Sequence, residues 1–160
     1  MPMPGLSHPH TPLCRGLVAW YGLFQLAHAL LNGRYLLSPG SPPFEAPPEG
    51  WLPQTVAFLN GMAVADFFNA LLTLVFVFGY FRRREWSAWL GTMTLTVSVY
   101  AQAVFLWGTV ESGALRGVGI DYLWVNVPFI PVLVLFGAWC YWGASGRLAD
   151  LGTSKEERAV

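Results

Sequence analysis

The sequence predicts an all-α membrane protein: a four-transmembrane-helix bundle with an intramembrane ligand cavity. Three observations support this fold class, namely long stretches without charge, a charge bias between the connections, and polar residues aligned along helical faces. Of the 160 residues, 54% are apolar and only 11% are charged, against about 25% charged in an average soluble domain. The nine basic and nine acidic residues cancel, so no nucleic-acid partner is expected.

Four segments are long and apolar enough to form the spans. A helix rises about 1.5 Å per residue, so roughly 20 residues cross the hydrocarbon core of a bilayer. The sequence therefore predicts one helical domain, residues 16–143, between a tail at 1–15 and a tail at 144–160. The predicted spans are about 16–37, 54–81, 86–110 and 121–143.

Basic residues gather on the side of the bundle that would carry both termini. That side has seven of the nine, which are Arg15, Arg82, Arg83, Arg84, Arg147, Lys155 and Arg158. The other side has only Arg34 and Arg116. The positive-inside rule then predicts that both termini are cytoplasmic. The bilayer is an expected partner, and a homodimer stays open.

Polar side chains recur at helical spacing within the predicted spans, where residues three, four and seven apart share a face. The stripes are Tyr21, Gln25, His28 and Asn32; Met62, Asp66, Asn69 and Thr73; Thr94, Ser98 and Gln102; and Tyr122, Asn126 and Phe129. Polar groups at membrane depth normally face a partner or a cavity. The four stripes therefore predict a pocket with a polar floor and aromatic walls.

Several of these polar residues have an ordinary structural explanation. Thr and Ser in spans often bond to their own helix, so Thr92, Thr94, Thr96 and Ser98 are assigned mainly to packing. Gln25, Asn69 and Gln102 suit interhelical hydrogen bonds as well as a ligand. For His28 a role in a site is favoured over that of a satisfied buried histidine.

Asp66 is the strongest candidate for a functional residue. It lies near the middle of its span, and no other span has a cationic residue in its interior. A carboxylate at that depth is expensive to ionise unless it is paired. An acid beside the imidazole of His28 suits proton transfer to a lipid double bond, and it equally suits binding of a lipophilic amine.

The sequence predicts neither a metal site nor an organic cofactor. His8, His10 and Cys14 are the nearest approach to a ligand cluster, but tail histidines are usually solvated. No Gly-rich phosphate loop occurs. In the fourth span, Pro128 and Pro131 interrupt the helix, which leaves carbonyls available to a ligand or to a neighbouring helix.

Four stretches carry a resemblance to a known family. They are WYGLFQLAHALLNGRYLL, AVADFFNALLTLVFVFGYFRRREW, TVSVYAQAVFLWGTVES and DYLWVNVPFIPVLVLF, and they cover most of residues 18–138. In their order and polar positions they resemble the EXPERA family, which includes the emopamil-binding protein (a sterol Δ8–Δ7 isomerase) and the sigma-2 receptor. The resemblance implies a pocket for a sterol or isoprenoid-type lipid, or for a cationic amphiphilic amine.

The resemblance also implies roles for individual residues. His28 matches a histidine near the reacting double bond, and the acid of the second span matches Asp66, or Met62 in an alternative alignment. Where the sterol isomerase has a glutamate, this chain has Asn32, so the acid–base pair would be Asp66 as proton donor and His28 as acceptor or partner.

The remaining substrate-binding candidates surround that pair. Asn126 and Tyr100 would orient the substrate, while Phe129 and Trp124 would stabilise positive charge. The other members of this set are Gln25, Asn32, Asn69 and Gln102.

Three functions are consistent with these features. The leading hypothesis is a cofactor-independent double-bond isomerase acting on a sterol or isoprenoid lipid. The alternatives are a non-catalytic protein that binds or transports a lipid or a cationic amphiphile, and a small structural subunit of a membrane complex.

Overall fold

The computed structural model describes residues 8–38, 52–111 and 126–151, and the regular structure within these ranges is helical. The α-helices are α1 (Pro12–Leu37), α2 (Pro53–Phe81), α3 (Trp86–Glu111) and α5 (Ile130–Ala144). Short 3-10 turns, η2 (Val127–Phe129) and η3 (Arg147–Leu151), flank α5. The prediction of an all-α fold is confirmed.

Three of the helical segments are long and apolar enough to cross a membrane. They are Val56–Phe81, Trp86–Gly108 and Val127–Ala144, which indicates a multi-pass membrane protein. The first predicted span forms a helix of 26 residues but does not belong to this group. It is the least apolar of the four helices, because its polar stripe occupies one face. The fourth predicted span is described only from residue 126 onward.

Local sequence explains where α1 begins and how α2 ends. Pro12 occupies the first turn of α1, and the Thr11 hydroxyl accepts a hydrogen bond from the Cys14 amide at 3.3 Å, as an N-cap residue does. At the end of α2, Arg83 adopts a left-handed conformation with φ of 52°. The Arg83 amide donates to the Tyr80 carbonyl and the Arg84 amide to the Gly79 carbonyl. This pattern is a Schellman motif, in which glycine usually occupies the left-handed position.

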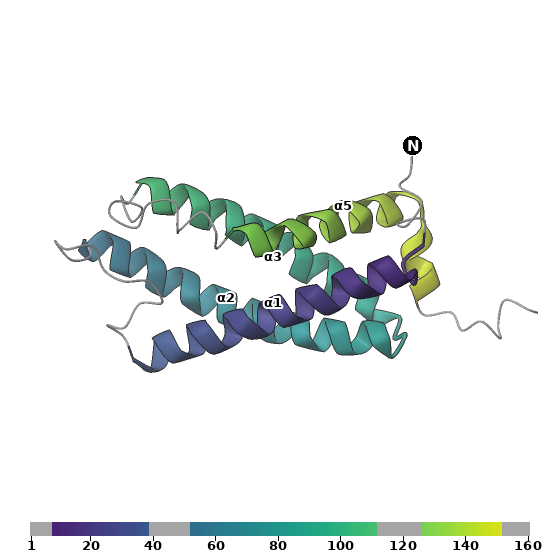
Figure 1. Cartoon of the computed structure of the whole chain (residues 1–160), viewed down its shortest axis with the longest axis horizontal. Coiled ribbons are helices and arrows are strands. Elements are labelled where there is room, and N and C mark those ends of the chain that lie inside the picture. The colour runs from purple at the N-terminus through teal and green to yellow at the C-terminus, as the bar shows by residue number, and fades with distance from the viewer. Residues whose placement is uncertain (1–7, 39–51, 112–125, 152–160) are drawn as a thin grey trace, which may run out of the picture.

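The helices form an elongated bundle in which α1 and α3 both pack along α2, while α5 lies along α1 and α3 (Figure 1). The start of α1, the α2–α3 turn and η3 lie at one end of the bundle, which we call the arginine end. Buried side chains from every helix pack together in the half next to it. They include Cys14, Tyr21, Phe76, Tyr80, Trp139, Trp142 and Leu151. The other half of the bundle contains the site.

Candidate functional site

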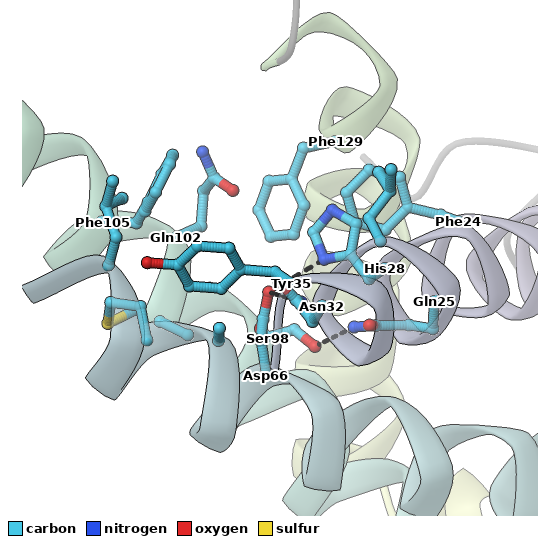
Figure 2. Close-up of a pocket in the computed structure, with 15 residues that line it drawn as sticks. Phe24, Gln25, His28, Asn32, Tyr35, Asp66, Ser98, Gln102, Phe105 and Phe129 are labelled. Carbon is cyan, nitrogen blue, oxygen red and sulfur yellow. Dashed lines mark hydrogen bonds and ion pairs between the residues drawn. The ribbon is translucent and has the colours of Figure 1, made fainter. Parts of the chain in front are cut away.

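A cavity of about 210 Å³ lies in the half of the bundle away from the arginine end. Its lining comes from α1, α2 and α3, and from η2 through Phe129. Most of the lining is apolar, with a polar group formed by His28, Asn32 and Asp66 (Figure 2). The lining residues are Phe24, Gln25, His28, Leu31, Asn32, Tyr35, Leu59, Met62, Ala63, Asp66, Ser98, Ala101, Gln102, Phe105 and Phe129.

The His28 imidazole and the Asp66 carboxylate meet across α1 and α2. Nδ1 of His28 lies 2.9 Å from Oδ2 of Asp66, and the Asn32 amide donates to the same oxygen at 3.4 Å. His28 and Asn32 reach one carboxylate because they are four residues apart on α1. Because Nδ1 of His28 faces Asp66, Nε2 lies on the opposite edge of the ring and points towards Phe129 (Figure 2). Within the described residues, Nε2 has no hydrogen-bond partner.

The imidazole packs against one of a pair of aromatic rings. The ring centroids of Phe24 and His28 are 4.3 Å apart, with the planes tilted by 43°, and Phe24 also contacts Phe129 at 5.7 Å. Such rings present electron-rich faces to a cation. A positive charge on His28 or on a ligand beside it would therefore be stabilised by these rings as well as by Asp66.

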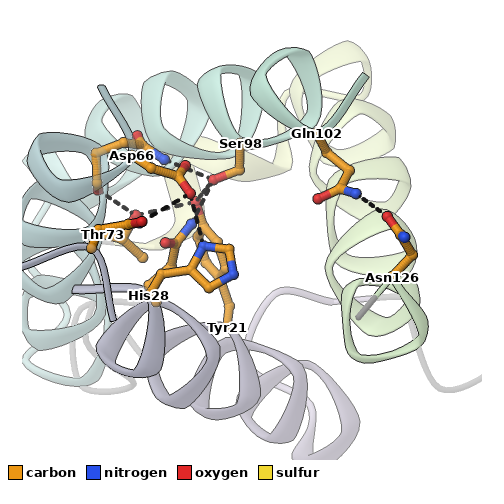
Figure 3. Close-up of polar contacts among 10 residues, drawn as sticks. Tyr21, His28, Asp66, Thr73, Ser98, Gln102 and Asn126 are labelled. Atoms are coloured by element: carbon orange, nitrogen blue, oxygen red, sulfur yellow. Dashed lines mark hydrogen bonds and ion pairs between the residues drawn. The ribbon is translucent and has the colours of Figure 1, made fainter. Parts of the chain in front are cut away.

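Ser98 lies at the centre of a second polar network, which joins α1, α2 and α3 (Figure 3). Its Oγ accepts hydrogen bonds from the side-chain amides of Gln25 and Asn69, both at 2.8 Å, and lies 2.7 Å from the Tyr21 hydroxyl. A serine hydroxyl has one hydrogen and two acceptor positions. Because the two amides occupy both acceptor positions, the Ser98 hydroxyl must donate to Tyr21. Thr73 extends the network with a contact of 3.2 Å to the Tyr21 hydroxyl.

Gln25 forms the boundary between this network and the cavity. Its Nε2 donates to Ser98, while its Oε1 is buried and has no hydrogen-bond partner among the described residues. An unsatisfied buried acceptor costs about 1–3 kcal/mol. A hydroxyl or a water molecule that reached Oε1 would recover that energy, so Gln25 can add a hydrogen bond to a ligand in the cavity.

The proline turn of the fourth segment closes the site on its remaining side. The Gln102 amide donates to the side-chain oxygen of Asn126, which connects α3 with the start of η2. The Trp20 indole donates to the Pro128 carbonyl at 2.9 Å. The carbonyl that Pro131 frees is that of Val127, four residues earlier, and it accepts from the Ile130 amide instead. Figure 3 shows the Gln102–Asn126 contact across from His28 and Asp66.

Among the described residues, the structure brings seven predicted site residues to the cavity or into contact with its lining, and it places two elsewhere. Gln25, His28, Asn32, Asp66, Gln102 and Phe129 line it, and Asn126 bonds to one of these. Asn69 is buried in the Ser98 network instead. Tyr100 is 70% exposed and lines a shallow groove with Phe58 and Trp107. Trp124 lies outside the described residues.

The position of Tyr100 corrects its predicted role in orienting the substrate. Two residues along a helix turn about 200°, so a side chain two positions after Ser98 points to nearly the opposite face. Since Ser98 faces the interior, Tyr100 cannot face it as well. Ser98, which the sequence assigns mainly to packing, both lines the cavity and holds three helices together.

Three aromatic lining residues were missed by the sequence analysis. Tyr35 lies three residues after Asn32 and continues the polar stripe of α1, so the stripe itself could have revealed it. Phe24 lies one turn before His28 and could have been found in the same way. Phe105 lies three residues after Gln102 and continues the stripe of α3 in the same way.

Comparison of the chain with protein-family models, with curated proteins and with solved structures found no match. The resemblance to the EXPERA family therefore stays a prediction. Among the described residues, no group of three or more His, Cys, Asp or Glu side chains could hold a metal ion.

Proposed function

We propose that this chain is an integral membrane protein that binds a sterol or isoprenoid-type lipid in the cavity and isomerises a double bond by proton transfer. The observation that supports this most is the His28–Asp66 contact of 2.9 Å on the wall of an aromatic-lined cavity. A carboxylate on Nδ1 fixes the orientation of an imidazole. Nε2, the other nitrogen, is then the atom that can exchange a proton with a ligand.

This arrangement divides the acid–base roles in a specific way. Oδ2 of Asp66 already accepts from His28 and Asn32, so we assign proton transfer to Nε2 of His28 and the positioning of the ring to Asp66. The protonated imidazole gives its Nε2 proton to one alkene carbon, and the other carbon becomes a carbocation. Loss of a proton from the neighbouring carbon to Nε2 forms the new double bond and restores the imidazolium.

Aromatic faces lower the energy of the cationic intermediate. Phe24 packs against the imidazole and Phe129 packs against Phe24, and both line the cavity, where a cation formed near Nε2 would meet their rings. Stabilisation that appears only when the charge develops accelerates the chemical step rather than binding.

The size and charge of the cavity restrict the ligand. An engineered protein cavity of about 150 Å³ holds benzene, so about 210 Å³ admits one or two rings or a branched isoprenoid unit. A larger lipid would place only its reacting part inside. The lining contains no Lys or Arg among the described residues, so a phosphate or carboxylate group would find no partner there.

Deuterium incorporation tests the proposal without knowledge of the substrate. The purified protein in vesicles would be incubated in D₂O with a panel of sterol and isoprenoid alkenes, and the lipids examined by mass spectrometry. We expect a mass increase of one unit in one lipid class, abolished by His28→Gln and strongly reduced by Asp66→Asn. Tyr100→Phe, outside the cavity, is the matched control. Absence of deuterium from every lipid with the folded wild-type protein would refute proton transfer.

Binding of a lipophilic amine is the second candidate function. A carboxylate among aromatic rings also suits a tertiary ammonium group, and Asp66 has no Lys or Arg partner among the residues that the structure describes. A fluorescent aryl-alkyl tertiary amine would then bind wild-type protein and lose affinity with Asp66→Asn, while no lipid gains deuterium. The same amine binding together with deuterium incorporation would favour the isomerase, because an ammonium group imitates the carbocation.

A further inference from the structure

We propose that the arginine end of the bundle binds the phosphate groups of anionic phospholipids, through Arg15 and the α2–α3 turn Arg82–Glu85. This surface is separate from the cavity and does not depend on the proposed function. Arg15 lies in the first turn of α1, and Arg82, Arg83 and Arg84 occupy the turn after α2. Figure 1 shows the start of α1 and this turn at the same end of the bundle.

Among the described residues, the arginines at this end have no carboxylate within ion-pair distance. In the described part of the chain, the one contact between a basic and an acidic side chain within 4 Å is His28–Asp66. Arg15, Arg82, Arg83 and Arg84 are all exposed, and each lacks a carboxylate partner in that part of the chain. Four exposed guanidinium groups at the edge of an apolar bundle are therefore available to anions from their surroundings.

Two of these arginines lie against aromatic rings at the edge of the apolar surface. The guanidinium carbon of Arg15 is 5.8 Å from the Phe81 ring centre, and that of Arg82 is 5.3 Å from the Phe78 ring centre. Both rings are exposed on the outside of the bundle, where acyl chains would cover them. A guanidinium group that stacks on an aromatic face keeps its N–H donors, which lie in its own plane, free for the headgroup layer.

The turn that carries the other arginines is rigid and strained. Arg83 has φ of 52°, a conformation that glycine adopts without penalty and other residues do not. The turn is also tight, because the Trp86 ring packs on Gly79 so closely that a Cβ there would lie 2.3 Å from it. Glycine at position 83 would adopt this left-handed conformation without the penalty that arginine pays. We therefore expect the Arg83 side chain to have a role other than forming the turn. Residues held in strained conformations are concentrated at binding sites.

The opposite end of the bundle differs in charge. Among its described residues, Arg34 is the one cation, and Glu111 lies at the end of α3. Guanidinium groups bind phosphate with two parallel hydrogen bonds. Three consecutive arginines on a fixed turn, with Arg15 nearby, thus match a phospholipid headgroup layer at one end only. Arg34 supplies an internal control, because it is an exposed arginine at the other end.

Lipid selectivity measured by native mass spectrometry tests this proposal. The full chain in a neutral detergent would be titrated with phosphatidylglycerol or phosphatidylcholine, and the bound lipids counted. We expect preferential binding of phosphatidylglycerol. Each arginine near an anionic surface contributes about a fivefold change in affinity, so Arg82→Gln, Arg83→Gln and Arg84→Gln together should weaken binding about 100-fold. Arg34→Gln should leave it unchanged.

A single substitution separates binding from folding. Arg83→Gly removes one charge but relaxes the turn, so the variant should fold at least as well and bind phosphatidylglycerol about fivefold more weakly. Equal binding of the two lipids by wild type, or an equal loss with Arg34→Gln, would overturn the proposal. Displacement of phosphatidylglycerol by an equal concentration of inorganic phosphate would also overturn it, because the site would then recognise free phosphate.

Discussion

Replacing Ser98 with alanine removes the group that connects three helices. The Ser98 hydroxyl contacts Gln25 of α1, Asn69 of α2 and Tyr21 of α1 at 2.7–2.8 Å. Interhelical hydrogen bonds in membrane proteins contribute about 0.6 kcal/mol each. Loss of three should lower the free energy of unfolding by about 2 kcal/mol. This loss is larger than that of one hydrogen bond, because the side chains of Gln25, Asn69 and Tyr21 stay buried without the Ser98 hydroxyl.

Unfolding in mixed micelles of increasing dodecyl sulfate content would measure this change, followed by the fluorescence of the eight tryptophans. Ser145→Ala is the matched control. The Ser145 side chain is exposed and bonds only to the Trp142 carbonyl, at 3.3 Å and within its own segment. We expect a change within about 0.5 kcal/mol for this surface variant. If Ser98→Ala unfolded at the same dodecyl sulfate content as Ser145→Ala, the network would not hold the helices together.

Three further predictions concern packing, backbone strain and a buried thiol. Gly91→Ala should lower the free energy of unfolding by about 1–3 kcal/mol in the same assay, because its Cβ would lie 2.5 Å from Trp139. Gly137→Ala, whose added Cβ would meet nothing within 4 Å, should instead raise the free energy of unfolding by up to about 1 kcal/mol. Equal effects of the two substitutions would refute the close packing of Trp139 on Gly91. Arg83→Gly should raise the free energy of unfolding by about 1 kcal/mol through relief of the left-handed strain, and a decrease would contradict this. Burial raises the pKa of the Cys14 thiol, so the unfolded chain ionises first and stability should fall as pH rises above the ordinary thiol range. Cys14→Ser should remove the fall in stability that thiol ionisation causes. The unfolding midpoints of the wild type and of this variant across alkaline pH would measure the difference.

Helix positions were the most predictable part of the fold. The predicted segments 54–81 and 86–110 end within a residue or so of α2 and α3, because charged residues and a proline mark their limits. Helix α1 begins at Pro12, four residues before the predicted segment, because Thr11 and Pro12 form its cap. Spacing within one helix also predicted which residues share a face, so Gln25, His28 and Asn32 were grouped correctly.

What spacing could not supply is the rotation of each helix within the bundle. Helix α3 has hydroxyl, amide and aromatic side chains on several faces, so its sequence does not identify the inward one. The contacts of Ser98 with α1 and α2 turn that residue inward, and Tyr100 is exposed as a result. For Asn69 the sequence left an interhelical hydrogen bond and a ligand contact open, and the structure shows the interhelical bond, to Ser98.

The polar face of α1 has a consequence for how the protein enters its membrane. A helix with Gln25, His28 and Asn32 on one side gains less from the bilayer than the other three do. Those side chains find their partners on α2 and α3, which are synthesised later. We therefore expect α1 to stay at the translocon or the membrane surface until α2 arrives, and the two to insert as a hairpin. Asp66 and His28 would then shield each other during biogenesis before either of them meets a ligand.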